Sequence, residues 1–132
     1  MAAGRYSFVI EQGATLDFEI AYTDASGNAI DLTNHSGRMQ IKDSYGSSTT
    51  YITLSSSISP DGTGLNFSGS NNDNSPVSGT IGIFISANSS SLLNFSEAVY
   101  DLEIVSGSTY PVVTRVLEGK IRLSKEVTTG NY

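Results

Sequence analysis

The chain has 132 residues, which is enough for one domain with a substantial hydrophobic core but short for two. Its 13 acidic and 7 basic side chains leave a net charge of -6, so the chain repels the phosphate backbone on which nucleic-acid binding depends, and no nucleic-acid partner is expected. It contains no cysteine, which excludes a disulfide framework and a thiolate metal site.

The first apolar run, residues 8–10, is too short for a signal-peptide core and far below the roughly 20 residues of a membrane span. We therefore expect a protein that is made in the cytosol without a signal peptide and that has no membrane partner.

The first half of the chain predicts short strands separated by turns. Residues 15–22 show the cleanest alternation, with Leu16, Phe18 and Ile20 on one face, and a period of two is typical of a half-buried strand. Residues 24–28 contain the aspartate, glycine and asparagine that hairpin turns use. Further extended segments are expected at residues 6–10, 29–32, 38–42 and 51–54.

The middle of the chain is polar and favours loops around a short strand at residues 65–67. Residues 69–76 are almost pure loop chemistry, and residues 71–74 offer the oxygen atoms that calcium prefers. They lack the spaced acidic side chains of a dedicated calcium loop, so a solvated loop is the preferred interpretation. The sequence leaves open whether the 69–76 loop binds an ion.

Residues 79–86 predict a strand that is apolar on both faces. Ile81, Ile83 and Ile85 lie on one face and Gly82 and Phe84 on the other, which is typical of a central strand packed on both sides.

Near residues 88–94, a serine or asparagine cap before two adjacent leucines predicts at most one short helical segment. The triple-serine runs at residues 55–57 and 89–91 are interpreted first as loop filler.

The C-terminal region predicts two long strands, residues 98–105 and 112–123, joined by a tight turn. Gly119 interrupts the second strand, and a glycine there marks either a bulge or a close backbone approach. Taken together, the strand and turn signals predict an all-β, antiparallel β-sandwich as a single domain over residues 1–127, followed by a frayed tail at residues 128–132.

Catalytic signatures are missing from the sequence. His35 is the single histidine, with no second histidine or cysteine to complete a metal site or a nucleophile relay. Asp17 with Glu19, and Asp101 with Glu103, share a strand face in the way that any amphipathic strand allows. We therefore predict a protein that is not an enzyme and has no catalytic residue, no cofactor and no metal ligand.

Tyrosines are the best candidates for contacts. A tyrosine offers a large rigid apolar ring with a polar tip, which suits both protein interfaces and stacking on sugar rings. The candidate interface or glycan contacts are Tyr45, Tyr51, Tyr110 and Tyr132.

Several segments together resemble small virion structural proteins of tailed bacteriophages. The opening resemblance lies in Gln12-Gly-Ala-Thr-Leu16, Tyr22-Thr-Asp24, Gly27-Asn28 and Ile30-Asp-Leu32, and it continues in residues 80–87, 99–104 and 116–121. The resemblance covers most of the chain except residues 43–76. It implies an immunoglobulin-like domain that resides in the virion, self-associates and assembles with other virion proteins in the tail, baseplate or fibre-attachment region.

Other functions remain open from the sequence. The resemblance also allows a capsid decoration protein. A carbohydrate-binding module for host glycans predicts a groove where at least two of the candidate tyrosines line up. A small hydrolase, the least favoured hypothesis, predicts a buried carboxylate pair facing a cleft.

Overall fold

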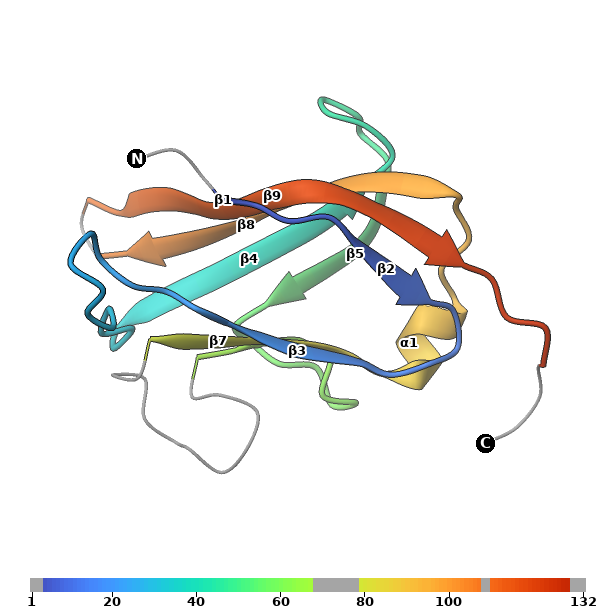
Figure 1. The fold of residues 1–132 in the computed structure, drawn as a ribbon, viewed down its shortest axis with the longest axis horizontal. Helices are drawn as coiled ribbons and strands as arrows, with labels where there is room; N and C mark the ends of the chain where they lie inside the picture. Colours follow the sequence, from blue (N-terminus) through green and yellow to red (C-terminus); the bar gives the residue numbers. More distant parts are fainter. Residues whose placement is uncertain (1–3, 68–78, 108–109, 129–132) are drawn as a thin grey trace.

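The computed structural model describes residues 4–67, 79–107 and 110–128, which form two β-sheets packed face to face with a short helix at one end (Figure 1). The larger sheet contains β1 (Gly4–Arg5), β2 (Phe8–Glu11), β4 (His35–Lys42), β5 (Thr50–Ser55), β8 (Glu97–Ser106) and β9 (Val112–Ser124). The smaller sheet contains β3 (Leu16–Ala21), β6 (Gly64–Asn66) and β7 (Thr80–Ile85), and the helix is α1 (Ala87–Ser91).

The expected all-β sandwich with at most one short helical segment is confirmed, but the larger sheet is mixed rather than purely antiparallel. Its order is β1-β9-β8-β4-β5, and β2 also pairs with β9. Both β1 and β2 run parallel to β9, with Phe8 in register with Ile121. An alternating pattern identifies a half-buried strand but not its neighbour or its direction, so the sequence could not predict this parallel pairing.

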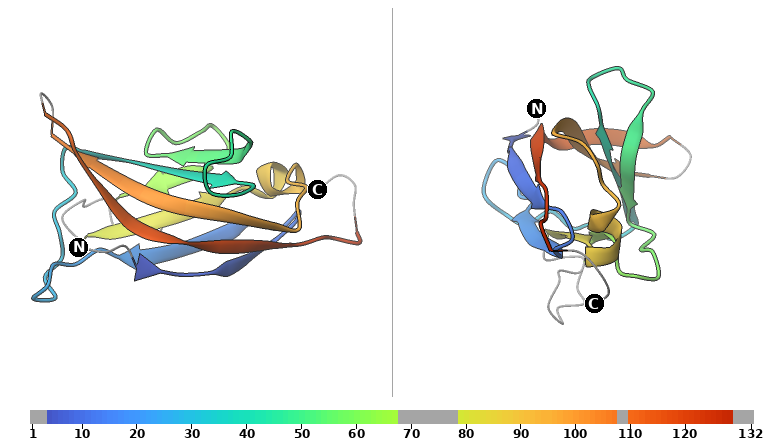
Figure 2. Two further views of the ribbon diagram at one scale, coloured as in Figure 1. Left: turned by 90° about the horizontal axis from the view of Figure 1, so that it is seen from above. Right: turned by 90° about the vertical axis from the view of Figure 1, so that its right-hand side faces the viewer.

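The core lies between the sheets and is built from the inward-facing positions of both. Ile81, Ile83 and Ile85 of β7 are fully buried, as are Met39 and Leu102 of the larger sheet. Figure 2 shows the two sheets as facing layers, and the buried cluster lies between them. The apolar positions that the period of two assigns to β4, β7 and β8 are therefore the core positions.

Some predicted elements differ in extent. Residues 29–32 form no strand and contribute an isolated bridge between Thr23 and Ala29. His35 is the first residue of β4, and Asn34 with φ 62° takes the left-handed turn position before it. Helix α1 is shorter than the segment that the sequence suggested and begins after the cap Ser86, whose side chain accepts a hydrogen bond from Ser89 N.

Of the two features expected at Gly119, a bulge or a close backbone approach, the structure shows the close approach. The register of β8 with β9 shifts between Leu102 and Glu103, so the irregularity lies outside Gly119 itself. A Cβ on Gly119 would stand 2.1 Å from the carbonyl oxygen of Tyr6, which passes directly over it. The hydroxyl of buried Tyr100 donates a hydrogen bond of 2.5 Å to the same oxygen. Burial raises the pKa of Tyr100, so this phenol keeps the proton that it donates.

Two expectations fall outside the described residues. These are the polar loop at residues 69–76, including its possible ion, and residues 129–132 with Tyr132.

Candidate functional site

Two of the candidate tyrosines are strongly exposed and lie at opposite ends of the larger sheet. Tyr45 is 68% exposed in the loop after β4, and Tyr110 is 86% exposed just before β9. The start of β4 pairs with the end of β8, next to the hairpin turn that leads to Tyr110. The loop that carries Tyr45 follows the other end of β4, so these two tyrosines do not line a common groove (Figure 1).

Tyr51 lies at the margin of the core. Its ring stacks on buried Phe95, with ring centroids 4.7 Å apart, and its hydroxyl donates to a carboxylate oxygen of Asp43 at 3.3 Å. Desolvation, assisted by the charge of Asp43, raises the pKa of Tyr51. One face of the Tyr51 ring is therefore packed against the chain's own core.

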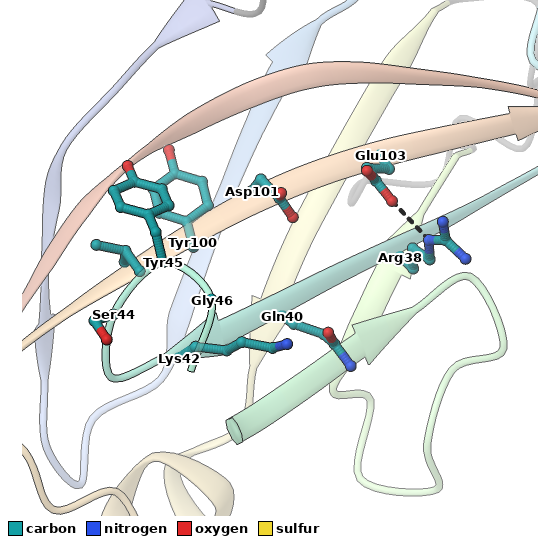
Figure 3. A pocket seen from close by; sticks show the side chains of 10 residues that line it. Arg38, Gln40, Lys42, Ser44, Tyr45, Gly46, Tyr100, Asp101 and Glu103 are labelled. Carbon is teal, nitrogen blue, oxygen red and sulfur yellow. Dashed lines mark hydrogen bonds and ion pairs between the residues drawn. The ribbon is translucent and has the colours of Figure 1, made fainter. Parts of the chain in front are cut away.

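A pocket of about 350 Å³ lies on the outer face of the larger sheet beside Tyr45 (Figure 3). Arg38 donates to Glu103 at 2.7 Å at the end of the pocket away from Tyr45, and Asp101 lies 3.4 Å from the guanidinium of Arg115. Burial and the neighbouring Glu103 raise the pKa of Asp101, against the opposing effect of Arg115. The pocket lining combines cations, acids and two tyrosines: Arg38, Gln40, Lys42, Ser44, Tyr45, Gly46, Val99, Tyr100, Asp101 and Glu103.

The two carboxylate pairs singled out in the sequence have different surroundings. Asp101 and Glu103 are half-exposed, and each has an arginine partner. Asp17 and Glu19 are exposed on the outer face of β3. The buried carboxylate pair that the hydrolase hypothesis requires is thus not formed by either pair.

Basic side chains gather on the outer face of the larger sheet. Register places Arg5, Glu118, Asp101 and Gln40 in one row, with the other cations in parallel rows. The six cations on this face are Arg5, Arg38, Lys42, Arg115, Lys120 and Arg122, and its five acids are Glu11, Glu97, Asp101, Glu103 and Glu118. The rest of the described chain holds one lysine and seven acids. The surplus of negative charge among the described residues therefore lies outside the outer face of the larger sheet.

The smaller sheet has a groove of about 300 Å³ on its outer face, which sequence reasoning did not find. Its floor contains glycine backbone and the ring of Phe84, and Asp17 and Asp61 are among the lining residues. The groove is lined by Asp17, Ile58, Asp61, Gly62, Gly64, Asn66, Gly82 and Phe84. The sequence signal for this groove was Gly82, an outward-facing glycine in the middle of a strand.

Asp61 fixes the loop beside this groove to helix α1. One carboxylate oxygen accepts hydrogen bonds from the hydroxyls of Ser86 at 2.6 Å and Ser89 at 2.7 Å, and the other accepts from Thr63 N at 3.0 Å. These donors, led by Ser86, hold the pKa of Asp61 far below its usual range. The turn sequence predicted only the local bend, because its partners Ser86 and Ser89 are far away in the chain.

We expect Asp61→Asn to lower the midpoint of thermal unfolding at pH 7, because the amide nitrogen cannot accept a serine hydroxyl. A depressed folded-state pKa stabilises the fold above the unfolded-state pKa near 3.8. This contribution is lost as the pH falls towards the folded value, so the wild type and the variant should converge below about pH 4. Circular dichroism melts from pH 7 to pH 2 measure both effects. Asp24→Asn is the control, because Asp24 accepts from Ser26 N and Asn28 N through a single oxygen that asparagine retains.

The end of the β8–β9 hairpin exposes apolar side chains. Val112 and Val113 are 61% and 47% exposed and adjoin Tyr110. Residues 112–115 pair with β8 on one side, whereas the described partners on the other side of β9 begin at Leu117. We call Tyr110, Val112 and Val113 the hairpin end. It combines exposed apolar surface with a strand edge, the features that favour contact with another chain.

Neither a metal site nor a membrane span is evident in the part of the chain that the structure describes. No group of three or more histidine, aspartate or glutamate side chains there could hold a metal ion. No helix in the same residues is long and apolar enough to cross a membrane.

Comparison of the chain with protein-family models and with curated proteins gives no match.

Proposed function

We propose that this protein is a non-enzymatic structural subunit of a tailed-bacteriophage virion, in the tail, baseplate or fibre-attachment region, where it holds neighbouring subunits together. The sequence resemblance suggests the particle, and the hairpin end supports a role in adhesion. Tyr110, Val112 and Val113 are three large exposed side chains within four residues at one end of the molecule, with the two valines on opposite faces of β9. These exposed side chains are the observation on which the proposal rests, because large apolar side chains gathered at one exposed end are a mark of interaction sites.

Strand edges supply the second means of contact. In the hydrogen-bonding order of the described strands, β5 lies at one edge of the larger sheet, and β3 and β6 lie at the two edges of the smaller sheet. An edge strand can extend the sheet of a neighbour through backbone hydrogen bonds alone, while side chains on alternate positions provide specificity. Such a subunit binds its neighbours without a reactive group.

The test is cryo-electron microscopy of purified virions that the proposal expects to contain the chain. We expect several symmetry-related copies, with the hairpin end or a strand edge of each copy buried against a neighbour. Density on the capsid surface would favour the decoration protein instead of the tail location. Absence of the protein from purified particles would contradict the proposal.

A variant with Val112→Asp and Val113→Asp should fold but fail to incorporate into particles, because two charges would have to be desolvated in the contact. Incorporation is measured by quantitative mass spectrometry of purified virions, and circular dichroism checks the fold. Val127→Asp, at a position that is 96% exposed outside the hairpin end, is the control and should incorporate normally. Equal incorporation of all three proteins would show that the hairpin end is not a virion contact.

A further inference from the structure

Tyr45 is an exposed aromatic residue that an ordered turn holds beside the pocket on the outer face of the larger sheet. Ser47 N donates to the carbonyl oxygen of Ser44 at 3.1 Å, and Gly46 supplies the positive φ, 78°, at the third position of this turn. The side chain of Tyr45 is 68% exposed, and its hydroxyl has no hydrogen-bond partner among the described residues. The fold therefore holds this ring beside the pocket and leaves most of it uncovered.

The floor of the pocket offers polar groups that the chain does not use fully. Gln40 and Asp101 are in register on neighbouring strands, and Lys42 and Val99 form the next row towards the turn. In the part of the chain that the structure describes, the ammonium group of Lys42 has no ion-pair or hydrogen-bond partner. Asp101 directs Oδ2 towards Arg115, at 3.4 Å, which leaves Oδ1 for another donor. Hydrogen-bond donors and acceptors are thus both available along the floor.

The charges of the lining favour an uncharged ligand. Arg38 and Glu103 form an ion pair at the end of the pocket away from Tyr45, and the charge of Lys42 is balanced by that of Asp101. An anionic ligand would face the two acids, and a cationic ligand would face the two basic side chains. A purely apolar ligand would strip water from charged groups without replacing their hydrogen bonds. The lining therefore fits an uncharged molecule that is rich in hydroxyl groups.

A sugar ring combines these properties with a surface that suits Tyr45. Its hydroxyls donate and accept hydrogen bonds, and those made to charged groups such as Lys42 and Asp101 are the stronger kind. The C–H groups on one face of a pyranose ring form an apolar surface that packs on an aromatic ring. The pocket volume of about 350 Å³ lies near the lower end of the range for small-molecule sites, about 300–1,000 Å³, so it suits a short ligand.

We propose that this pocket binds a neutral pyranose sugar, with one face of the ring on Tyr45 and the hydroxyls bonded to the polar side chains of the floor. The pocket contains one of the four candidate tyrosines instead of the two that a carbohydrate-binding module predicts. We therefore expect one sugar ring to bind, with a dissociation constant on the order of 1 mM. This site goes beyond the proposed function, which involves no ligand.

Saturation-transfer-difference NMR on the full chain tests the site. The probes are glucose, galactose, mannose, N-acetylglucosamine and rhamnose, each as the free sugar and as its methyl glycoside, with glucuronic acid as the charged comparison. We expect transfer to the ring C–H protons of at least one neutral sugar and weaker transfer to glucuronic acid. Binding of the methyl glycoside would support the site and identify the end of a glycan chain as the source of the ligand. Binding of the free sugar alone would support the site and identify a free monosaccharide.

Substitutions locate the binding in this pocket. Tyr45→Ala should weaken binding of that sugar about tenfold, because it removes the stacking surface, whereas Tyr45→Phe should retain most of the affinity. Tyr110→Ala is the matched control, because it removes another exposed tyrosine at the opposite end of the sheet and should leave binding unchanged.

Gln40→Ala tests the polar floor and should weaken binding about threefold to tenfold through the loss of one hydrogen bond. Within the chain the Gln40 amide makes one long hydrogen bond, of 3.5 Å to Thr53, so the fold should be retained. Thermal melts of all variants check this.

Three results would each overturn this inference: no transfer to any neutral sugar of the set, equal binding by the wild type and Tyr45→Ala, or tighter binding of glucuronic acid than of every neutral sugar. The proposed function is decided by whether virions contain the chain, so none of these results bears on it. The two proposals can therefore fail separately.

Discussion

Gly119→Ala is expected to lower the free energy of unfolding by about 1–3 kcal/mol, the usual cost of forcing an extra group into a packed site. The new Cβ would stand 2.1 Å from the carbonyl oxygen of Tyr6 and 2.7 Å from its carbonyl carbon. Both are backbone atoms, so the conflict cannot be relieved by turning a side chain. The segment between β1 and β2 would have to move away from β9.

The hydrogen bond from Tyr100 makes that movement more costly. Its buried hydroxyl donates to the same Tyr6 oxygen, and a buried donor that loses its partner costs about 1–3 kcal/mol. Movement of Tyr6 would also disturb its ring contacts with Phe8 and Phe18, whose centroids lie 5.7 and 5.9 Å away. The loss should therefore reach the upper part of the expected range when the hydrogen bond breaks.

Urea unfolding of the wild type, Gly119→Ala and Gly4→Ala measures this effect. Gly4 lies on the same β1–β9 border, but a Cβ there would make ordinary contacts of 3.5 and 3.6 Å. Its substitution should change stability by no more than about 0.5 kcal/mol. Similar stability of all three proteins would show that Tyr6 does not press on Gly119 in solution.

Local periodicity predicted the strands best where one face meets the core. Leu16, Phe18 and Ile20 alternate with exposed residues in β3 as expected. A period of two is enough to predict such a strand, because the face that is buried needs apolar side chains and the face in water needs polar ones. In β7 the same reasoning identified Gly82 and Phe84 as the outward pair, and the structure places both in the groove.

Features that depend on distant partners could not be predicted. The parallel pairing of Phe8 with Ile121 joins the two ends of the chain. Asp61 holds Ser86 and Ser89 across a long sequence separation, although its neighbours indicated only a turn. Hydrogen bonds of this kind leave no periodic pattern in the sequence, because a single polar atom in the right place is enough to form one.

The serine run at residues 89–91 shows how composition misleads. It was interpreted as loop filler, but Ser90 is fully buried in α1. Its hydroxyl accepts from Gly13 N at 3.0 Å and donates to the carbonyl oxygen of Ala14 at 2.8 Å. A single serine therefore ties the helix to the turn between β2 and β3, and burial rather than residue type decides its role.

Ser90→Ala is accordingly expected to destabilise the fold by about 1–3 kcal/mol. The substitution removes one small oxygen atom and leaves the carbonyl of Ala14 in the part-buried turn without this hydroxyl partner. Leaving a buried polar group without its partner costs its desolvation penalty, whereas the loss of packing volume is small. Urea unfolding gives the size of the effect, and hydrogen exchange of the β2–β3 turn should show where protection is lost.

Ser91→Ala is the matched control, because it removes a hydroxyl from the adjacent residue of the same helix. Ser91 donates only to the carbonyl of Asn88 within α1, in an exposed position where water can replace it. Its substitution should cost no more than about 0.5 kcal/mol. Equal destabilisation by the two substitutions would mean that both serines stabilise the fold only through the helix itself. The hydrogen bonds between α1 and the β2–β3 turn would then add nothing to the free energy of unfolding.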